Sequence, residues 1–238
     1  MLLGVAQIRK WASVWSLAGL SEAAGGTLDR HADAQLLVFA KPAGLLSVPG
    51  IGPDKQDCLR ARAQQQWPDA MIVHRLDMAT SGLILMARGP DMQRTLSRAF
   101  EQRQVHKRYE AVVLGEPLPV PDAQGWSRIA LPMRIDYHNR PRSIVDYGHG
   151  KPSLTHWRTL GPGPWPGTTR LQLEPFTGRT HQLRVHLAAI GHPIVGDPLY
   201  APPEGRALSA RLLLHASELS LQHPASGQPL ALSHPAPF

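Results

Sequence analysis

Cysteine is almost absent from this sequence of 238 residues, in which Cys58 is the single one. One cysteine excludes an internal disulfide and a zinc site built on cysteines, and it fits a reducing compartment. Long apolar runs are missing too. Residues 2–20 include Arg9 and Lys10, so they are too polar to span a membrane. They also lack a signal-peptide cleavage pattern. We therefore expect a soluble, cytoplasmic protein that does not attach to membranes.

Acidic side chains are outnumbered: 18 aspartates and glutamates stand against 25 lysines and arginines, which gives a net charge of +7. Most of the basic residues are arginines, which bind phosphates with two donors and stack on nucleobases. This composition favours nucleic acid as the large partner. The alternative is a basic protein with no such partner, and charge alone does not separate the two.

The apolar pattern predicts more strands than helices. Helices are expected over residues 54–66, 90–103 and 180–190. Strands are expected over residues 36–40, 71–73, 83–87, 109–114, 155–160, 169–174, 212–216 and 218–221, with short ones near Ile129 and Val145. The strands come in runs and do not alternate with helices. The sequence therefore predicts an α+β fold with a mostly antiparallel sheet flanked by helices and loops.

The first 33 residues differ from the rest, because they end in a run of small and polar residues that resembles a linker. We expect residues 1–33 to be an N-terminal extension, either a disordered arm or a segment outside the translated protein. Residues 34–238 are expected to form one catalytic domain.

Residues 71–88, MIVHRLDMATSGLILMAR, hold a short polar loop between two apolar runs. A loop held in this way has a fixed position, which suits a catalytic carboxylate such as that of Asp77. Aspartate, threonine, serine and glycine are also common turn residues. The alternative is therefore that Asp77 only shapes the turn.

Five motifs together resemble the RluA family of pseudouridine synthases. They are HRLDMATSG at 74–82, KRYEA at 107–111, GRTHQLRVHL at 178–187, KPAGLLSVPG at 41–50 and RLLLHA at 211–216. The first three occur in the order of the family, and the resemblance runs from about Leu36 to the C-terminus. It implies a mixed, curved β-sheet crossed by an RNA cleft. Many relatives carry an N-terminal S4 RNA-binding domain, for which the residues before the resemblance are too few.

The resemblance also implies the chemistry. Pseudouridine formation breaks the N1–C1′ bond of a uridine, turns the base and joins C5 to C1′, so it is an isomerisation that needs no cofactor and no metal. Asp77 matches the catalytic aspartate, and Arg184 matches the arginine that pairs with it. Tyr109 matches a tyrosine that stacks on the uracil ring, and its hydroxyl is a candidate for removing the C5 proton. The alternative for Tyr109 is a buried tyrosine in a strand.

The same motifs supply candidates for RNA binding. Arg75 matches an arginine that fills the gap left by the flipped base, and the alternative is a simple phosphate contact. The other candidates are His74, Thr80, Lys107, Arg179, His181 and Gln182. His181 and His186 are five positions apart with no carboxylate between them, so they do not form the metal motif H-E-x-x-H, and no metal is expected.

Three functions are compatible with this composition and these motifs. The main one is a monomeric synthase acting on 23S rRNA, a tRNA anticodon stem-loop, or both. The second is a catalytically silent RNA-binding or RNA-chaperone protein on the same fold. The third is a hydrolase that uses Asp77 with a histidine, and no pattern of nucleophile, base and orienting group supports it.

Overall fold

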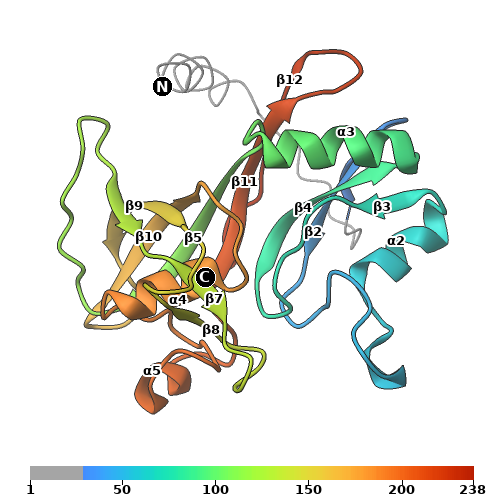
Figure 1. Ribbon diagram of the computed structural model, residues 1–238. Helices are drawn as coiled ribbons and strands as arrows, with labels where there is room; N and C mark the ends of the chain where they lie inside the picture. The colour runs from blue at the N-terminus through green and yellow to red at the C-terminus, as the bar shows by residue number, and fades with distance from the viewer. Residues whose placement is uncertain (1–28) are drawn as a thin grey trace.

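The computed structural model describes residues 29–238 (Figure 1). The helices are α2 (Leu59–Gln66), α3 (Gly89–Glu101), α4 (Gln182–Ala189) and α5 (Pro203–Ala207), with a 3-10 turn at Pro53–Lys55. The strands are β1 (Asp29–Ala32), β2 (Leu36–Lys41), β3 (Ala70–Ile72), β4 (Ser81–Arg88), β5 (His106–Leu114), β6 (Ser127–Ala130), β7 (Met133–Ile135), β8 (Ser143–Val145), β9 (Leu154–Pro162), β10 (Thr168–Pro175), β11 (Leu214–Gln222) and β12 (Pro229–Ser233).

Ten of these strands form one sheet. Its main path has the order β1-β2-β4-β11-β5-β10-β9-β6, while β3 pairs with β4 and β12 pairs with β11. The contact between β4 and β11 is parallel, and the other described pairings are antiparallel. Strands β7 and β8 form a separate hairpin. These features confirm the expected α+β class with a mostly antiparallel mixed sheet.

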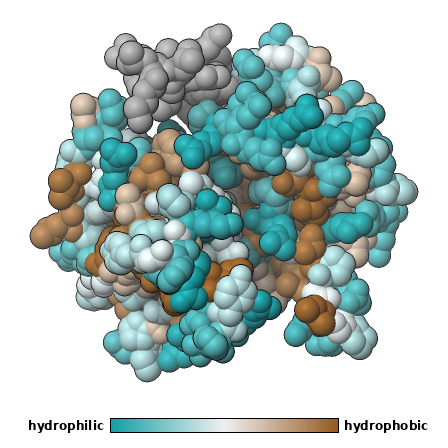
Figure 2. Space-filling model, in the orientation of Figure 1, coloured by the Kyte–Doolittle hydropathy of each residue, from teal (hydrophilic) through white to brown (hydrophobic). Residues whose placement is uncertain are grey.

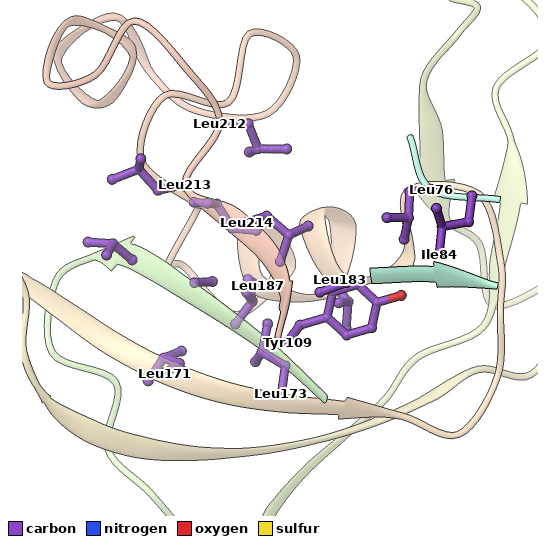
Figure 3. Packing of buried hydrophobic residues seen from close by; sticks show 14 of the residues in the cluster. Leu76, Ile84, Tyr109, Leu171, Leu173, Leu183, Leu187, Leu212, Leu213 and Leu214 are labelled. Carbon is purple, nitrogen blue, oxygen red and sulfur yellow. The ribbon is translucent and has the colours of Figure 1, made fainter. Parts of the chain in front are cut away.

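The sheet buries a different core on each face, because side chains alternate along a strand. On β2, Leu36 and Val38 belong to the core beneath α3, whereas Leu37 and Phe39 belong to the core covered by α2 and α4. Figure 3 shows part of the second core, where strands β5, β10 and β11 pack against α4. Helices α2 and α4 therefore cover the same face of the sheet, and Leu76, the neighbour of Asp77, is buried on that face.

Two parts of the molecule meet at the parallel contact. One part holds β2, β3, β4, α2 and α3, the other holds β5, β9, β10 and α4, and β11 runs between them (Figure 1). The pairing of β4 with β11 spans only His215 opposite Ser81 and Ala216 opposite Gly82. In the same orientation, Figure 2 shows the surface hollowed between these parts, with hydrophilic side chains along much of the hollow.

Gly82 permits this close contact. Its φ is +111°, and a Cβ atom placed there would lie 2.3 Å from the carbonyl oxygen and 2.5 Å from the nitrogen of Ala216. No other residue type fits at such a distance from a backbone. A glycine directly after the polar loop therefore lets β4 approach β11 and brings the loop to the second half of the chain.

The local periodicity predicted α3 well. Leu96 is fully buried in the core, and Met92, Ala99 and Phe100 of the same helix pack against that core. The expected helix 54–66 is wrong in its first part. Cys58 is extended and bridges to Leu46, so α2 begins only at Leu59. The isolated bridge to Leu46 overrides local helix propensity here.

Three further differences concern the ends of the chain. The strands expected at 212–216 and 218–221 are one strand, β11, with a bulge between Ala216 and Glu218. Strand β12 and helix α5 lie in segments where no element was expected. Strand β1 lies within the expected extension 1–33 and pairs with β2. The remainder of that extension, residues 1–28, is outside the described residues.

Candidate active site

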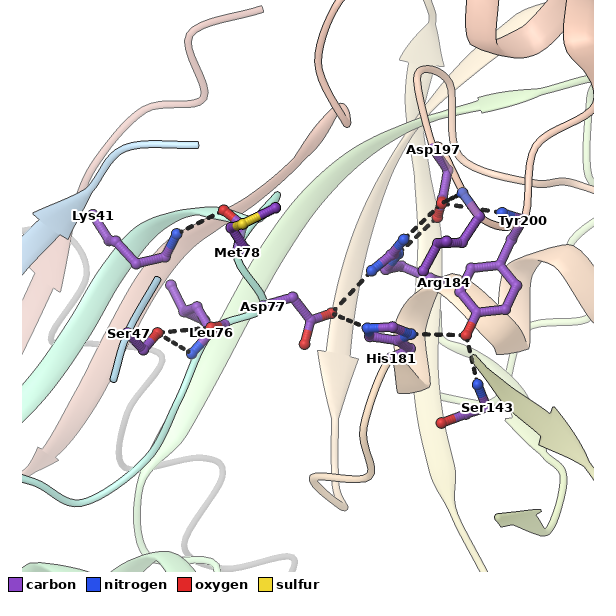
Figure 4. Close-up of polar contacts among 11 residues, drawn as sticks. Lys41, Ser47, Leu76, Asp77, Met78, Ser143, His181, Arg184, Asp197 and Tyr200 are labelled. Carbon is purple, nitrogen blue, oxygen red and sulfur yellow. Dashed lines mark hydrogen bonds and ion pairs between the residues drawn. The ribbon is translucent and has the colours of Figure 1, made fainter. Parts of the chain in front are cut away.

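The backbone on both sides of Asp77 is tied to the segment that follows β2. Ser47 Oγ donates to the Leu76 carbonyl at 2.7 Å and accepts from the Leu76 amide at 3.2 Å. On the other side, the Met78 carbonyl accepts from the Gly44 amide at 2.8 Å and from Lys41 Nζ at 3.1 Å. Asp77 therefore stands on a loop whose two neighbouring residues are both fixed (Figure 4).

Lys41 is buried beneath this loop. Its Nζ also donates to the carbonyls of Pro42 and Leu45, at 2.9 and 2.8 Å, so all three of its N–H groups have carbonyl partners. Burial, with a smaller effect of Arg211, lowers the pKa of Lys41 to about 8 against the opposing effect of the Asp77 carboxylate. The lysine serves as a structural donor within the loop.

Helix α4 brings Arg184 to the other side of Asp77. Nη1 of Arg184 lies 3.5 Å from Asp77 Oδ2. The opposite edge of the guanidinium, Nε and Nη2, forms two hydrogen bonds of 2.7 Å to the fully buried Asp197. Asp197 also accepts from the amides of Leu199 and Tyr200 at 2.9 and 3.1 Å. Such a bidentate pair fixes the plane of the arginine and aims its free edge at Asp77.

Arg184 keeps its positive charge at neutral pH. Burial by itself lowers the pKa of Arg184, but the hydrogen bonds and charge of Asp197, with a smaller contribution from Asp77, more than compensate and raise it above its ordinary value. A permanently charged guanidinium therefore lies beside Asp77.

His181 completes the surroundings of Asp77. Its Nε2 lies 3.9 Å from Asp77 Oδ2, and its Nδ1 lies 2.8 Å from Tyr200 Oη. His181 has a φ of 57°, the left-handed conformation, at the N-terminal end of α4. Burial is the largest influence and lowers the pKa of His181, so the ring is neutral near pH 7.

Tyr109 lies on β5 in the core on the same face. Its ring packs near Leu173 and Leu183, and its hydroxyl points toward Leu76 and Ile84 (Figure 3). Burial first, and then the charge of the Asp77 carboxylate, raise the pKa of Tyr109. The phenol is therefore protonated near neutral pH, with its hydroxyl within electrostatic reach of Asp77.

Three other candidates lie in the same motifs. Arg75 is exposed two positions before Asp77, and the buried Thr80 donates its amide to the Asp77 carbonyl at 3.1 Å. Gln182 is buried with all its hydrogen-bonding capacity used inside the protein. Its amide oxygen accepts from Thr177 Oγ1 and the Arg179 amide, and its Nε2 donates to the Leu154 carbonyl and Thr155 Oγ1.

His74 and Lys107 lie on the opposite face, beneath α3. The ring of His74 stacks on Phe100 at 4.5 Å between centroids, and Nε2 accepts from the Leu85 amide at 2.9 Å. Lys107 Nζ lies 5.5 Å from the centroid of the same Phe100 ring. Burial, then the charge of Lys107, lower the pKa of His74 to about 3. The structure thus brings Asp77, Arg184, His181 and Tyr109 together, and it places His74 and Lys107 apart from them.

Arg179 is exposed, with Nη2 3.5 Å from the Pro152 carbonyl. No sequence motif indicated Asp197 and Tyr200, which contact Arg184 and His181 on the side away from Asp77. Their signal is weak, since Asp197 stands in a Gly-Asp-Pro segment of the kind found in many turns. Between residues 29 and 238, no cluster of histidine, cysteine and carboxylate groups is arranged to hold a metal ion. Within the same range, no helix has the length and apolar character needed to cross a membrane.

The site is thus a single partly exposed carboxylate between a fixed guanidinium and an imidazole, on a mixed sheet. Residues 35–189 match the family model described as RNA pseudouridylate synthase, and the chain belongs to this family.

The similarity extends over most of the chain. It is 45% identical over 208 residues to the dual-specificity RNA pseudouridine synthase RluA of Escherichia coli K12, an alignment that covers 87% of this chain and 92% of the relative. RluA of Pasteurella multocida is 44% identical over the same coverage. Among solved structures, human RNA pseudouridylate synthase domain containing 1 superposes with a TM-score of 0.73 at 28% identity, covering 92% of this chain and 87% of that one. These relatives confirm the resemblance that the five motifs carried.

Proposed function

We propose that this protein converts specific uridines of structured RNA into pseudouridine, with Asp77 as the nucleophile. The observation that carries the proposal is the position of Asp77, 28% exposed and 3.5 Å from the buried guanidinium of Arg184. The side chain is open enough to meet a ribose or base, and its partner is held in place from the other side by Asp197.

The reaction needs one carboxylate with three possible points of action. Asp77 attacks C1′ of the ribose, attacks the uracil ring, or takes the 2′ proton. In each route the N1–C1′ bond breaks, the base turns, C5 joins C1′, and the proton leaves C5 while N1 gains one. Atoms and electrons balance within the nucleoside, so the residues of this chain suffice. Arg184 stabilises the negative charge on Asp77 before attack and after release.

A uridine inside folded RNA must leave its stack to reach Asp77. Tyr109 supplies a flat face for the extruded uracil, because its ring is fixed in the core while its hydroxyl points to the loop of Asp77. The same hydroxyl is a candidate to accept the C5 proton. Tyr109→Phe separates the two roles, since it keeps the ring and removes the hydroxyl. Binding kept with rate lost supports proton transfer, and an unchanged rate leaves stacking alone.

The exposed Arg75 is placed to enter the RNA where the base has left. Unstacking a base costs a few kcal/mol, and a planar guanidinium restores part of that cost. The phosphate backbone is attracted by the net charge of +7 and by Arg179, which is exposed in the motif at 178–187.

The identity of the target RNA is a more detailed assignment than the reaction. The curated relatives are named dual-specificity enzymes, which supports action on two RNA classes, and we propose 23S rRNA and a tRNA anticodon stem-loop. A monomeric state and a cytoplasmic location stay predictions. The rival function is an RNA-binding or RNA-chaperone protein without activity, and the cluster of Asp77, Arg184 and Tyr109 speaks against it.

One experiment tests both the reaction and the substrate. Pseudouridines are mapped in cellular 23S rRNA and tRNA with and without the gene, and the purified protein is given RNA labelled with tritium at C5 of uridine. We expect at least one position to lose its pseudouridine without the gene and the same RNA to release tritium in vitro. RNA binding without tritium release would favour the inactive alternative.

A further inference from the structure

Tyr200, which no motif pointed out, contacts both groups that face Asp77. Its Oη lies 2.8 Å from His181 Nδ1, and its ring centroid lies 5.1 Å from the guanidinium carbon of Arg184. Its own backbone amide donates to Asp197 at 3.1 Å. The tyrosine is therefore fixed at its backbone and its ring, and its hydroxyl has a defined position (Figure 4).

The hydrogen bonds of Oη decide where His181 carries its proton. The amide of Ser143, at 2.8 Å, can only donate, so it occupies an acceptor site on Oη. If His181 Nδ1 also donated to Oη, the hydroxyl hydrogen would need a third partner. Within residues 29–238, only Ser143 and His181 hydrogen-bond to Oη. Donation from the hydroxyl to Nδ1 satisfies Oη with these two partners alone, and in that arrangement the neutral ring of His181 carries its hydrogen on Nε2.

This Nε2–H group faces Asp77. Nε2 of His181 lies 3.9 Å from Oδ2, and Nη1 of Arg184 lies 3.5 Å from the same oxygen. No donor in the described part of the chain hydrogen-bonds to Oδ1. Two donors thus converge on one carboxylate oxygen and leave the other open. The contact of Arg184 is a long hydrogen bond, and that of His181 is beyond hydrogen-bond distance. Catalytic contacts are often long without substrate, and we expect both to shorten when RNA binds.

We propose that Tyr200 is a positioning residue that holds His181 in its Nε2–H tautomer, so that His181 and Arg184 together hold Oδ2 of Asp77 and present Oδ1 to the uridine. The activity part of this inference rests on the proposed function. A merely structural alternative exists, in which Tyr200 only fastens the β7–β8 hairpin to α4 through Ser143.

The left-handed conformation of His181 provides well-matched variants. Asparagine tolerates that conformation better than most residues, so His181→Asn keeps the backbone but places its amide at the position of Nδ1. His181→Gln places an N–H donor near the position of Nε2. Tyr200→Phe keeps the ring beside Arg184 and removes only the hydroxyl. Tyr147→Phe, at a tyrosine that is 80% exposed, is the control.

The first readout is independent of activity. The ring nitrogens of His181, assigned by the signals missing in His181→Asn, are observed by ¹⁵N NMR near pH 7.5. We expect Nε2 to carry the hydrogen in the wild-type protein, and Tyr200→Phe to give a mixture of tautomers. A wild-type ring protonated at Nδ1 would overturn the proposal, whatever the enzyme does.

The second readout is the single-turnover rate of tritium release, with the RNA dissociation constant measured in parallel. We expect His181→Asn to be slower by about 10- to 100-fold, the effect of one lost hydrogen bond to a charged group. Tyr200→Phe should be slower by a smaller factor of roughly two- to fivefold, because part of its His181 rings keep the Nε2–H tautomer. RNA affinity should stay within about threefold, because the lost contact is internal. His181→Gln should be faster than His181→Asn, and the double variant no slower than His181→Asn alone.

A full rate in Tyr200→Phe, or equal rates in the two His181 variants, would also overturn the proposal. The structural alternative predicts a lower unfolding midpoint for Tyr200→Phe with an unchanged tautomer. If the wild-type protein releases no tritium, the proposed function fails, while the tautomer experiment still tests the arrangement of Tyr200 and His181.

Discussion

Oδ2 of Asp77 lies 3.5 Å from Nη1 of Arg184, although 107 positions of sequence separate the two residues. Neither side chain depends on the other for its position. The loop of Asp77 is tied to the segment after β2, and Arg184 is held by two 2.7 Å bonds to Asp197. The site is thus preorganised, which places the guanidinium where the reaction needs it before RNA arrives.

Asp77→Asn should abolish turnover and leave the fold intact. The amide has nearly the same shape but cannot attack carbon or accept the 2′ proton. Arg184 keeps its partner Asp197, so no buried charge is left unpaired. We expect tritium release to be undetectable while RNA affinity changes by less than about threefold, by filter binding. Substantial residual tritium release would contradict the role given to Asp77.

Arg75→Ala should slow the reaction more on a structured stem-loop than on a short unstructured oligonucleotide. Only the stem-loop must pay for an unstacked base, and only there does the guanidinium restore stacking. The ratio of the two single-turnover rates is the measurement. Arg60→Ala, which removes the same charge from an exposed position on α2, is the control. Equal losses on both RNAs would indicate a phosphate contact instead.

Asp197→Ala should be strongly destabilising, because the buried guanidinium of Arg184 loses the carboxylate that neutralises it and accepts two of its hydrogen bonds. Removing one partner of a buried ion pair typically costs about 3–5 kcal/mol of unfolding free energy. Urea denaturation checks this value. Asp91→Ala, which breaks an exposed ion pair with Arg94 on α3, should change the midpoint little. Similar effects of the two substitutions would show that the Arg184–Asp197 pair contributes little.

Gly82→Ala should lower both stability and activity. The position needs a positive φ, and the added Cβ would lie 2.3 Å from the Ala216 carbonyl oxygen. The conformational cost alone is about 1–3 kcal/mol, and the clash pushes β4 from β11, which moves the loop of Asp77. Gly148→Ala, where the nearest atom to a Cβ would be Asp146 Oδ1 at an ordinary 3.5 Å, is the control. Thermal denaturation and tritium release should both separate the two variants.

Acid should destabilise the fold through buried histidines. His186 is fully buried between Thr155 and Ser153, and burial lowers its pKa to about 4. Because the pKa of His186 is lower in the folded state than in the unfolded state, the unfolded chain binds more protons between about pH 6.5 and 4. Stability from this residue is complete above pH 6.5 and is lost as the pH falls toward 4, with a total of about 3 kcal/mol.

The measurement is the free energy of unfolding in urea at several pH values between 7.5 and 4. His186→Gln should flatten that dependence, although His215, whose pKa burial also lowers to about 4, retains part of it. His149→Gln, at a side chain that is 87% exposed, should leave the slope unchanged. An identical slope in His186→Gln and the wild-type protein would contradict the assignment.

Local pattern was sufficient where neighbours in sequence decide the structure. The buried stripe of α3 and most strands follow from apolar periodicity, which side-chain geometry imposes directly on the chain. The motifs also indicated Asp77, Tyr109 and Arg184, which the fold brings to one face of the sheet. The expected helix 54–66 failed in its first part because the backbone of Cys58 pairs with Leu46, and a local pattern carries no information on such pairing.

The sequence by itself determined the class of fold and the family, and it indicated Asp77 as the catalytic candidate, because periodicity and contiguous motifs carry this information. Only the tertiary structure decided that Asp197 holds Arg184, that Tyr200 orients His181, and that His74 and Lys107 lie beneath α3 instead of beside Asp77. These relationships depend on the register between strands and on the short contact of β4 with β11. Both are set by packing over the whole sheet, so no single stretch of sequence encodes them.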